Sequence, residues 1–86
     1  MPSYRIETKA AFERAFDRLP SDIQRRITAR VDGLAEDPRP PGVEKLAGAD
    51  DLWRVRVGDY RVIYQIDDGV LLILLVKVGH RREVYR

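Results

Sequence analysis

Arg56 and Arg61 flank a short turn signal, and together they could bind an anion. The dipeptide Gly58-Asp59 lies between them and is typical of a two-residue β-hairpin turn. If Val57 pairs with Tyr60 in such a hairpin, the two guanidinium groups lie opposite each other on one face of a sheet. Like charges in opposite positions destabilise a sheet, so we expect the pair to serve an anionic ligand. A phosphate suits the planar donor fork of arginine.

Strand alternation also puts Arg54 on this face, two residues before Arg56. The apolar face of the same hairpin is then formed by Trp53, Val55, Val57, Tyr60, Val62 and Tyr64. A half-exposed sheet often carries arginine simply as a long polar side chain with an apolar stem, and for Arg54 alone this reading is the better one. For the pair of Arg56 and Arg61 we favour an anion site, because a neutral face could have used threonine or an opposite-charge pair.

The C-terminal segment VGHRREVYR, residues 78–86, gathers a second set of polar side chains: His80, Arg81, Arg82 and Tyr85. His80 is the only histidine; its pKa range suits proton transfer near neutral pH, although a lone histidine is more often structural. Without a second imidazole or any thiolate, we expect no metal site. Tyr85 either packs the chain end or offers a ring for stacking and hydrogen bonding beside basic groups, which suits unstacked RNA bases.

Length and composition narrow the classes of protein to consider. The 86 residues predict a single domain, 1–86, near the lower limit for one hydrophobic core. The absence of cysteine excludes disulfides, thiol nucleophiles and thiolate metal sites, and it suits a reducing compartment. The N-terminal sequence lacks the apolar core of a signal peptide, and the longest apolar run, Val70 to Val76, is too short to cross a bilayer. We therefore expect a cytoplasmic protein without membrane contact.

Positive charge is concentrated in the second half of the chain. The whole sequence carries 16 Lys and Arg against 14 Asp and Glu, a net charge of +2. Residues 52–86 hold 7 of the basic groups but only 4 of the acidic ones, so the excess coincides with the segment that contains the arginine pair. The arginines at positions 14, 18, 25, 26 and 30 lie among carboxylates, and we expect them on an ordinary solvated helix surface with local ion pairs.

Hydrophobic spacing predicts a short strand followed by two helices. Residues 4–8 alternate as a strand, and apolar residues then recur at helical spacing up to Pro20. Ser21 and Gln24 match a capping box, so a second helix should start at once and continue to a stiff, proline-rich connector at residues 37–42. The buried stripe of that second helix is expected to be Ile23, Ile27, Val31 and Leu34.

From Leu52 onward the pattern is that of strands joined by two tight turns, Gly58-Asp59 and Asp68-Gly69. The segment Val70 to Val76 is apolar on both faces and should be the central strand. The predicted fold is α+β, with the order strand-helix-helix-strand-strand-strand. Its sheet is expected to be four-stranded and mainly antiparallel, in the order 2-3-4-1, with the helix hairpin packed on the apolar face. The arginine face is left open.

The segments LAEDPRPPGVEKLAGADDLWRVRVGDYRVIYQIDDG and VGHRREVYR resemble the RelE toxins of bacterial and archaeal toxin–antitoxin pairs. The resemblance extends over essentially the whole chain and is most specific from Leu52 to Asp67 and at the C-terminus. It implies a RelE-like fold and a small ribonuclease that cuts messenger RNA, usually on the ribosome, without a metal or other cofactor. It also implies a RelB-like antitoxin that wraps around the toxin, and operator DNA would be contacted only by the complex of the two.

The resemblance also implies which residues form the site. Carried over by position, the family's active-site residues are Arg54, Arg56, Arg61, Arg81 and Tyr85. With His80 and Arg82 added from the C-terminal segment, the expected catalytic residues are Arg56, Arg61, Arg81, Tyr85 and His80, and the expected RNA-binding residues are Arg54 and Arg82. The implied reaction is attack of a ribose 2′-hydroxyl on the neighbouring phosphate, which leaves a 2′,3′-cyclic phosphate and a free 5′-hydroxyl.

The sequence departs from the family at Arg54 and Arg56, where the best-known members carry lysines. Arginine does not readily release its proton at neutral pH, so Arg56 is a poor general acid. His80 could supply the proton, or catalysis could be slow and depend on the ribosome to align the RNA.

Two other functions are consistent with the same fold. A ParE-like chain would inhibit DNA gyrase without cleaving anything, and a degenerate toxin would only bind its antitoxin and operator DNA. Tyr85 favours the nuclease, because ParE-like chains generally lack the terminal tyrosine. For any of these toxins, the antitoxin is expected to be acidic and partly disordered, with an amphipathic helix that docks on apolar surface.

Overall fold

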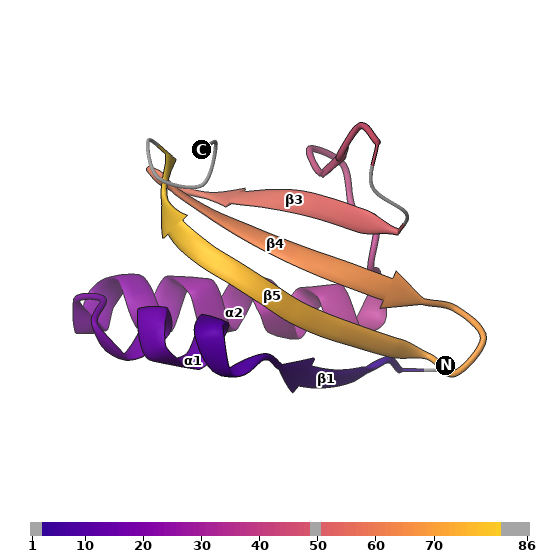
Figure 1. The fold of residues 1–86 in the computed structure, drawn as a ribbon, viewed down its shortest axis with the longest axis horizontal. Helices are drawn as coiled ribbons and strands as arrows, with labels where there is room; N and C mark the ends of the chain where they lie inside the picture. Colours follow the sequence, from indigo (N-terminus) through magenta and orange to yellow (C-terminus); the bar gives the residue numbers. More distant parts are fainter. Residues whose placement is uncertain (1–2, 49–50, 82–86) are drawn as a thin grey trace.

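The computed structural model describes residues 3–48 and 51–81. Its elements follow in the order β1 (Arg5–Thr8), α1 (Ala10–Asp17), α2 (Ser21–Glu36), β2 (Glu44–Lys45), β3 (Leu52–Val57), β4 (Tyr60–Asp67) and β5 (Leu72–His80) (Figure 1). The predicted α+β class is confirmed. None of the helices within the described ranges has the length and apolar character needed to cross a membrane.

The strands form one five-stranded mixed sheet in the order β1-β5-β4-β3-β2. β1 runs parallel to β5, and the other neighbouring strands are antiparallel. The four strands expected from the sequence keep their predicted neighbours, but the prediction of a four-stranded sheet is wrong. The additional strand, β2, pairs with the outer edge of β3 and has only two residues, which is too short to produce a period-two pattern.

β4 and β5 are joined by residues 68–71, and the predicted two-residue turn Asp68-Gly69 is wrong. Val70 is 59% exposed and Leu71 has a positive φ of 54°, so both residues belong to the connection. β5 accordingly starts two residues later than predicted and continues to His80. It was predicted to be the central strand, but it lies between β1 and β4, and the middle strand of the five is β4, because β2 extends the other edge of the sheet. An apolar run shows that a strand is buried, but it does not mark where the chain reverses direction.

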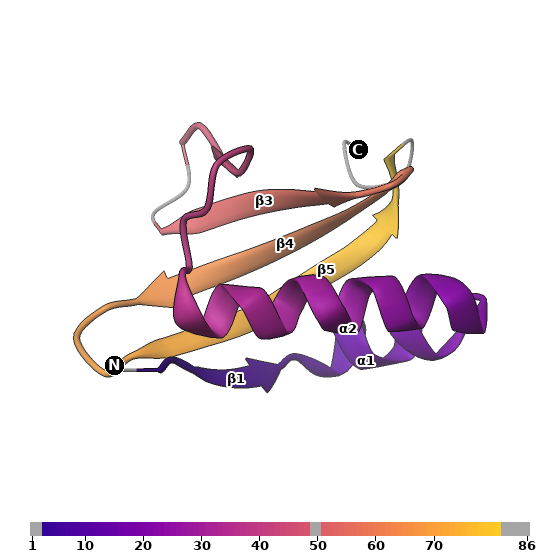
Figure 2. The ribbon, with the colours of Figure 1, turned by 180° about the vertical axis from the view of Figure 1, so that it is seen from behind.

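Both helices pack on one face of the sheet, as predicted, and Figure 2 shows α2 lying across that face. The helices contribute Phe12, Ile27, Val31 and Leu34 to the buried core. The sheet contributes Val55, Val57, Val62, Tyr64, Ile66, Ile73, Leu75 and Val78. Full burial of an aliphatic or aromatic side chain contributes about 1.5–3 kcal/mol, so this shared interface holds the two layers together.

α2 begins without the predicted capping box. Its N-cap residue is Pro20, and no side chain caps the helix. The side-chain amide of Gln24 instead donates a hydrogen bond to the carbonyl oxygen of Phe16 at 2.8 Å. Gln24 therefore links the two helices of the hairpin. Ser21 is the first residue of α2 and not its N-cap, so it is not placed to form the predicted capping box.

A β-bulge in β5 sets which side chains face the helices. The register shifts between Ile63, which pairs with Lys77, and Tyr64, which pairs with Leu75, so Val76 has no partner on β4. The extra residue reverses the alternation of side chains over the last part of β5. The end of the strand consequently presents to the helices the side chains that would otherwise face away from them.

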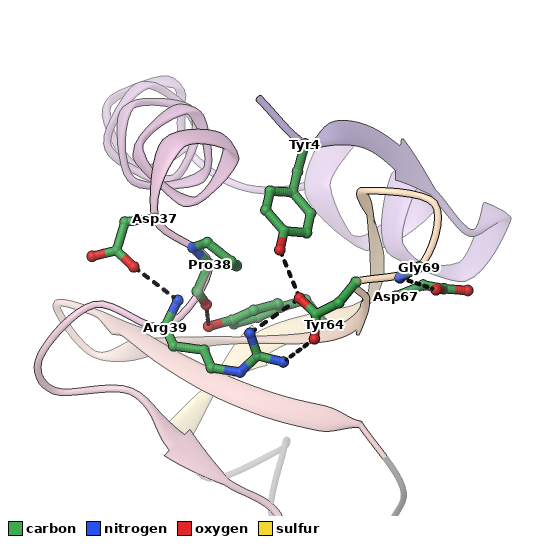
Figure 3. A network of polar contacts seen from close by, with 8 residues as sticks. Tyr4, Asp37, Pro38, Arg39, Tyr64, Asp67 and Gly69 are labelled. Atoms are coloured by element: carbon green, nitrogen blue, oxygen red, sulfur yellow. Dashed lines mark hydrogen bonds and ion pairs between the residues drawn. The ribbon is translucent and has the colours of Figure 1, made fainter. Parts of the chain in front are cut away.

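The proline-rich connector is fastened to the sheet by Tyr64. This ring is fully buried, and its hydroxyl donates a hydrogen bond to the carbonyl oxygen of Pro38 at 2.8 Å (Figure 3). Burial raises the pKa of Tyr64 to about 12, so the phenol is neutral and able to donate at any physiological pH.

A polar network ties the connector to three other parts of the chain. Arg39 donates to both carboxylate oxygens of Asp68, at 3.2 and 2.8 Å, and the hydroxyl of Tyr4 donates to the same carboxylate at 2.6 Å (Figure 3). The guanidinium carbon of Arg39 also lies 5.2 Å from the ring centroid of Trp53. The connector, the start of the chain, the β4–β5 connection and β3 therefore meet at one end of the sheet, and the β3–β4 turn lies at the other (Figure 1).

The variant Tyr64→Phe should lower the free energy of unfolding by about 1 kcal/mol, because it leaves the buried carbonyl of Pro38 without its donor while the ring packing is retained. Urea denaturation followed by circular dichroism measures the change. Tyr60→Phe is the matched control, since the hydroxyl of Tyr60 makes no hydrogen bond within the described residues and its loss should leave stability nearly unchanged. Equal stability of the two variants would contradict the proposed role of the bond.

Asp68 should make stability sensitive to acid. Hydrogen bonds from Arg39 and then Tyr4 hold the pKa of Asp68 below its ordinary value, so the ionised carboxylate favours the folded state above the unfolded pKa of about 3.9. This contribution is lost as the pH falls through the lower, folded pKa. The midpoint temperature of thermal unfolding should therefore fall more steeply between about pH 5 and pH 2 for the native sequence than for Asp68→Asn. If Asp68→Asn loses stability in acid as steeply as Asp32→Asn, a control on the exposed surface of α2, the network has no such role.

Candidate functional site

The predicted pairing of Arg56 with Arg61 is confirmed. β3 and β4 are in register through Val57 and Tyr60, and the next pair outward from the turn is the two arginines. Gly58 has a φ of 60°, which supplies the left-handed backbone that such a tight turn requires. The two guanidinium groups thus start from opposed positions on the sheet face that the helices do not cover.

Both arginines bend toward the turn. Arg56 Nε donates to the carbonyl oxygen of Gly58 at 3.2 Å, and Arg61 Nη1 donates to the carbonyl oxygen of Tyr60 at 3.3 Å. Arg56 is exposed and Arg61 is half-buried. The bond of Arg56 uses one of the five N–H donors of its guanidinium.

Arg81 joins the pair through the backbone. Its amide donates to the carbonyl oxygen of Asp59 at 2.8 Å, which extends the pairing of β5 with the β3–β4 turn by one residue. The neighbour of Arg61 on β5 is Gly79, so no side chain stands beside Arg61 on that strand. We call Arg56, Arg61 and Arg81 at this turn the basic corner; in Figure 1 it lies where β3 and β5 end and β4 begins.

Arg54 lies on the same face but forms an ion pair with a neighbouring strand. Glu44 on β2 is its direct cross-strand neighbour, and Arg54 Nη2 contacts Glu44 Oε2 at 2.6 Å. The side chain of Arg54 is only 15% exposed, while that of Glu44 is 67% exposed. The strand missed by sequence analysis therefore supplies a carboxylate that offsets the charge of Arg54.

The structure does not bring His80 to the arginine face. His80 pairs with Tyr60, and the two rings meet edge to face with centroids 5.7 Å apart. Together with Arg18 and Leu19 they line a small pocket between the end of α1 and the sheet. The β-bulge is the cause, because it turns the end of β5 toward the helices.

The other two predicted site residues, Arg82 and Tyr85, lie outside the described residues. Within the ranges 3–48 and 51–81, no group of three or more His, Asp or Glu side chains is placed to hold a metal ion. The described side chains gathered at the β3–β4 turn include guanidinium groups, which bind an anion and stabilise added negative charge.

Sequence analysis missed two basic side chains near the arginine pair. The bulge places Lys77 opposite Ile63 on the open face, and alternation without the bulge would have placed it under the helices. Arg26 of α2 reaches the β3–β4 turn: a Cβ added to Gly58 would lie 3.1 Å from its Nη2 and 3.3 Å from its Nη1. No pattern in the sequence indicates which side of α2 lies near this turn.

Gly58→Ala should destabilise the protein by about 1 kcal/mol, because an alanine at this positive φ is strained and its methyl group would displace the guanidinium of Arg26. Chemical denaturation measures the loss. Gly33→Ala is the control: it lies inside α2 with no atom within 4 Å of the added methyl group, and it should stabilise the helix. A Gly58→Ala protein as stable as the native one would contradict the turn geometry.

Comparison with known proteins identifies relatives over nearly the full length. The family model for the ParE toxin of the type II toxin-antitoxin system, parDE, matches residues 6–85. Toxin RelE of Mycobacterium tuberculosis is 32% identical over 84 residues, covering 96% of this chain and 87% of that protein. Toxin RelG of the same organism is 29% identical over 87 residues, covering 96% of this chain and 97% of that protein.

Solved structures agree with these sequence relatives. The archaeal RelE–RelB complex from Pyrococcus horikoshii OT3 has a TM-score of 0.83 at 34% identity and covers 94% of this chain and 98% of that chain. The intact E. coli RelBE toxin-antitoxin complex has a TM-score of 0.82 at 21% identity, a likeness that shows the fold alone, and covers 91% of this chain and 96% of that chain. With the sequence relatives and the shared fold taken together, the chain belongs to the RelE family of toxins from type II toxin–antitoxin pairs.

Proposed function

We propose that this toxin is a metal-independent endoribonuclease that cleaves messenger RNA on the ribosome and thereby inhibits translation. The observation that carries the proposal is the basic corner, where strand register and one backbone hydrogen bond bring Arg56, Arg61 and Arg81 to the same turn. Three guanidinium groups at the rim of a sheet suit the phosphodiester of a nucleic acid better than a neutral ligand. The similarity to proteins named RelE supports RNA as the substrate.

The proposed reaction is the attack of a ribose 2′-oxygen on the adjacent phosphorus. A P–O2′ bond forms while the P–O5′ bond breaks, which leaves a 2′,3′-cyclic phosphate on one fragment and a 5′-hydroxyl on the other. The 2′-hydroxyl loses a proton and the departing 5′-oxygen gains one, so the reaction consumes no water. Negative charge builds up on the phosphoryl oxygens, where Arg61 and Arg81 would stabilise it and Arg56 would hold the phosphate.

Proton transfer is the step for which the arginines are least suited. A guanidinium keeps its proton at neutral pH, and the ring of His80 lies against Tyr60 on the helix side of the sheet. We therefore assign His80 a packing role and propose that catalysis depends on charge stabilisation and on the ribosome, which holds the RNA in line. Tyr85 would bond to the 2′-hydroxyl or stack on the neighbouring base.

A RelB-like antitoxin is the proposed inhibitor. The similar solved structures include complexes of RelE with RelB, among them the Pyrococcus horikoshii complex at 34% identity. An acidic, partly disordered antitoxin would complement the basic corner and would gain affinity by ordering on the toxin. Its binding would block the nuclease by covering the same guanidinium groups that we propose for RNA.

A second candidate function is inhibition of DNA gyrase. The observation that favours it is the family model, which is described as a ParE toxin and matches residues 6–85. The two functions predict different lesions in the cell. A gyrase inhibitor causes double-strand breaks in DNA, whereas a nuclease causes cuts in translated messenger RNA.

Mapping the 5′ ends of cellular RNA after brief induction tests the proposal. Cuts should fall within translated regions, at fixed positions relative to the codon, and they should carry 5′-hydroxyl ends that a kinase can label. Double-strand DNA breaks without RNA cuts would favour the gyrase inhibitor. Absence of both lesions would indicate a chain that only binds its antitoxin.

Arg61→Ala and Tyr85→Phe should each lower RNA cleavage by roughly 100-fold or more and abolish growth arrest, since each removes a group placed on the reacting nucleotide. Primer extension on a translated reporter gives the cleavage rate, and growth after induction gives the toxicity. Arg25→Ala, a change at an exposed residue that lines a pocket between α1 and α2, is the control and should remain toxic. Full toxicity in both site variants, with normal folding, would exclude the nuclease.

A further inference from the structure

Arg26 brings a fourth guanidinium group to the β3–β4 turn from the helix layer. A Cβ added to Gly58 would lie 3.1 Å from Arg26 Nη2, 3.3 Å from Nη1 and 3.5 Å from the guanidinium carbon. These three atoms of the guanidinium thus lie on the side of Gly58 where a Cβ would project. Arg26 itself is exposed and sits in the N-terminal half of α2, which passes beneath this end of the sheet in Figure 2.

Arg56 reaches the same glycine from the other face of the sheet. Its Nε donates to the carbonyl oxygen of Gly58 at 3.2 Å, whereas Arg26 approaches the side of the residue where a Cβ would project. Two guanidinium groups therefore flank one residue that has no side chain. The rim of the sheet between the open face and the helix face is lined by positive charge on both sides.

Arg26 does not form the ion pair that its position on α2 would allow. Asp22 lies four residues before Arg26 on α2, the spacing and order in which an acid and a base stabilise a helix. Within the described residues Arg26 makes no ion pair and no hydrogen bond, and it lies instead beside a turn that already carries Arg56 and Arg61. Asp59 is the one carboxylate within the two-residue turn, and four guanidinium groups outnumber it.

We propose that Arg26 binds a backbone phosphate of the RNA next to the one that is cleaved. The strand would cross the rim of the sheet over Gly58, with the scissile phosphate in the basic corner and its neighbour at Arg26. Arg26 is then a positioning residue: it holds the strand in line and does not contact the reacting atoms. The inference rests on the proposed nuclease function and adds to it the direction in which the RNA leaves the site.

The test measures binding of the purified toxin to a short single-stranded deoxyoligonucleotide. This analogue of the RNA binds through its phosphates but cannot be cleaved, because it has no 2′-hydroxyl group. Fluorescence anisotropy gives the dissociation constant at several salt concentrations. Arg26→Gln should weaken binding about tenfold and should reduce the slope of log affinity against log salt by about 0.7, the value for one lost phosphate contact on a single strand. Arg26→Lys should restore the slope, because an ammonium also contacts phosphate.

The matched control is Arg25→Gln, which removes the same charge from the adjacent position on α2. Arg25 lines a pocket between the helices with Phe16, Thr28 and Asp32, and it is Arg26 that lies beside Gly58, so the salt slope should be nearly unchanged. Equal slopes for Arg26→Gln and Arg25→Gln, with equal melting temperatures, would overturn the inference. A native toxin that neither binds the analogue nor cuts RNA would instead overturn the proposed function, and the inference with it.

Cleavage of messenger RNA on ribosomes supplies a second readout. A positioning residue should raise KM when it is removed and should change kcat less, whereas loss of Arg61 should lower kcat. Arg26→Gln with an unchanged KM and a strongly reduced kcat would show that Arg26 acts on the reacting atoms, which contradicts the role assigned here.

Discussion

The pairing of β3 with β4 across Gly58 is the constraint on which the rest of the site depends. A two-residue turn fixes the register, and this register sets Arg56 directly opposite Arg61. A shift of one residue would exchange the two faces, placing the arginines under the helices and the buried valines in solvent. The apolar face prevents such a shift, because Val55, Val57 and Val62 are each at most 6% exposed. The hydrophobic core therefore holds the charged pair in place.

β5, which pairs with the other edge of β4, is governed by a different local feature. β5 has to keep Leu75 and Val78 on the helix side although they are three residues apart, and the unpaired Val76 makes this possible. The same bulge turns the end of the strand, so His80 packs against Tyr60 and Gly79 lies next to Arg61. One inserted residue thus removes an imidazole from the arginine face and leaves the space beside Arg61 without a side chain.

The sequence predicted the elements with strong local signals. Alternation from Leu52 to Asp67, together with a glycine-containing turn, was sufficient to predict the register of Arg56 and Arg61, and helical spacing was sufficient to predict the stripe of α2. The bulge at Val76 could not be predicted, because a uniformly apolar strand gives no sign of an extra residue. β2 was missed because two residues form no pattern, and with it the ion pair between Glu44 and Arg54. The position of Arg26 depends on how α2 packs on β3, which is a tertiary contact with no local signature.

The basic corner is built on rigid elements. This rigidity affects how the site would stabilise negative charge without a strong proton donor. Its arginines stand on or directly beside paired strands whose other face is buried, and Arg81 is held to the turn by its own backbone. Like charges in directly opposite positions, as at Arg56 and Arg61, repel in the free protein, and binding of an anion offsets that repulsion. A pentacoordinate phosphorus carries more negative charge than the substrate phosphate, so the relief is greater in the transition state than in the ground state. For the nuclease proposed above, this repulsion would favour the reaction itself as well as the binding of RNA, with the ribosome aligning the substrate.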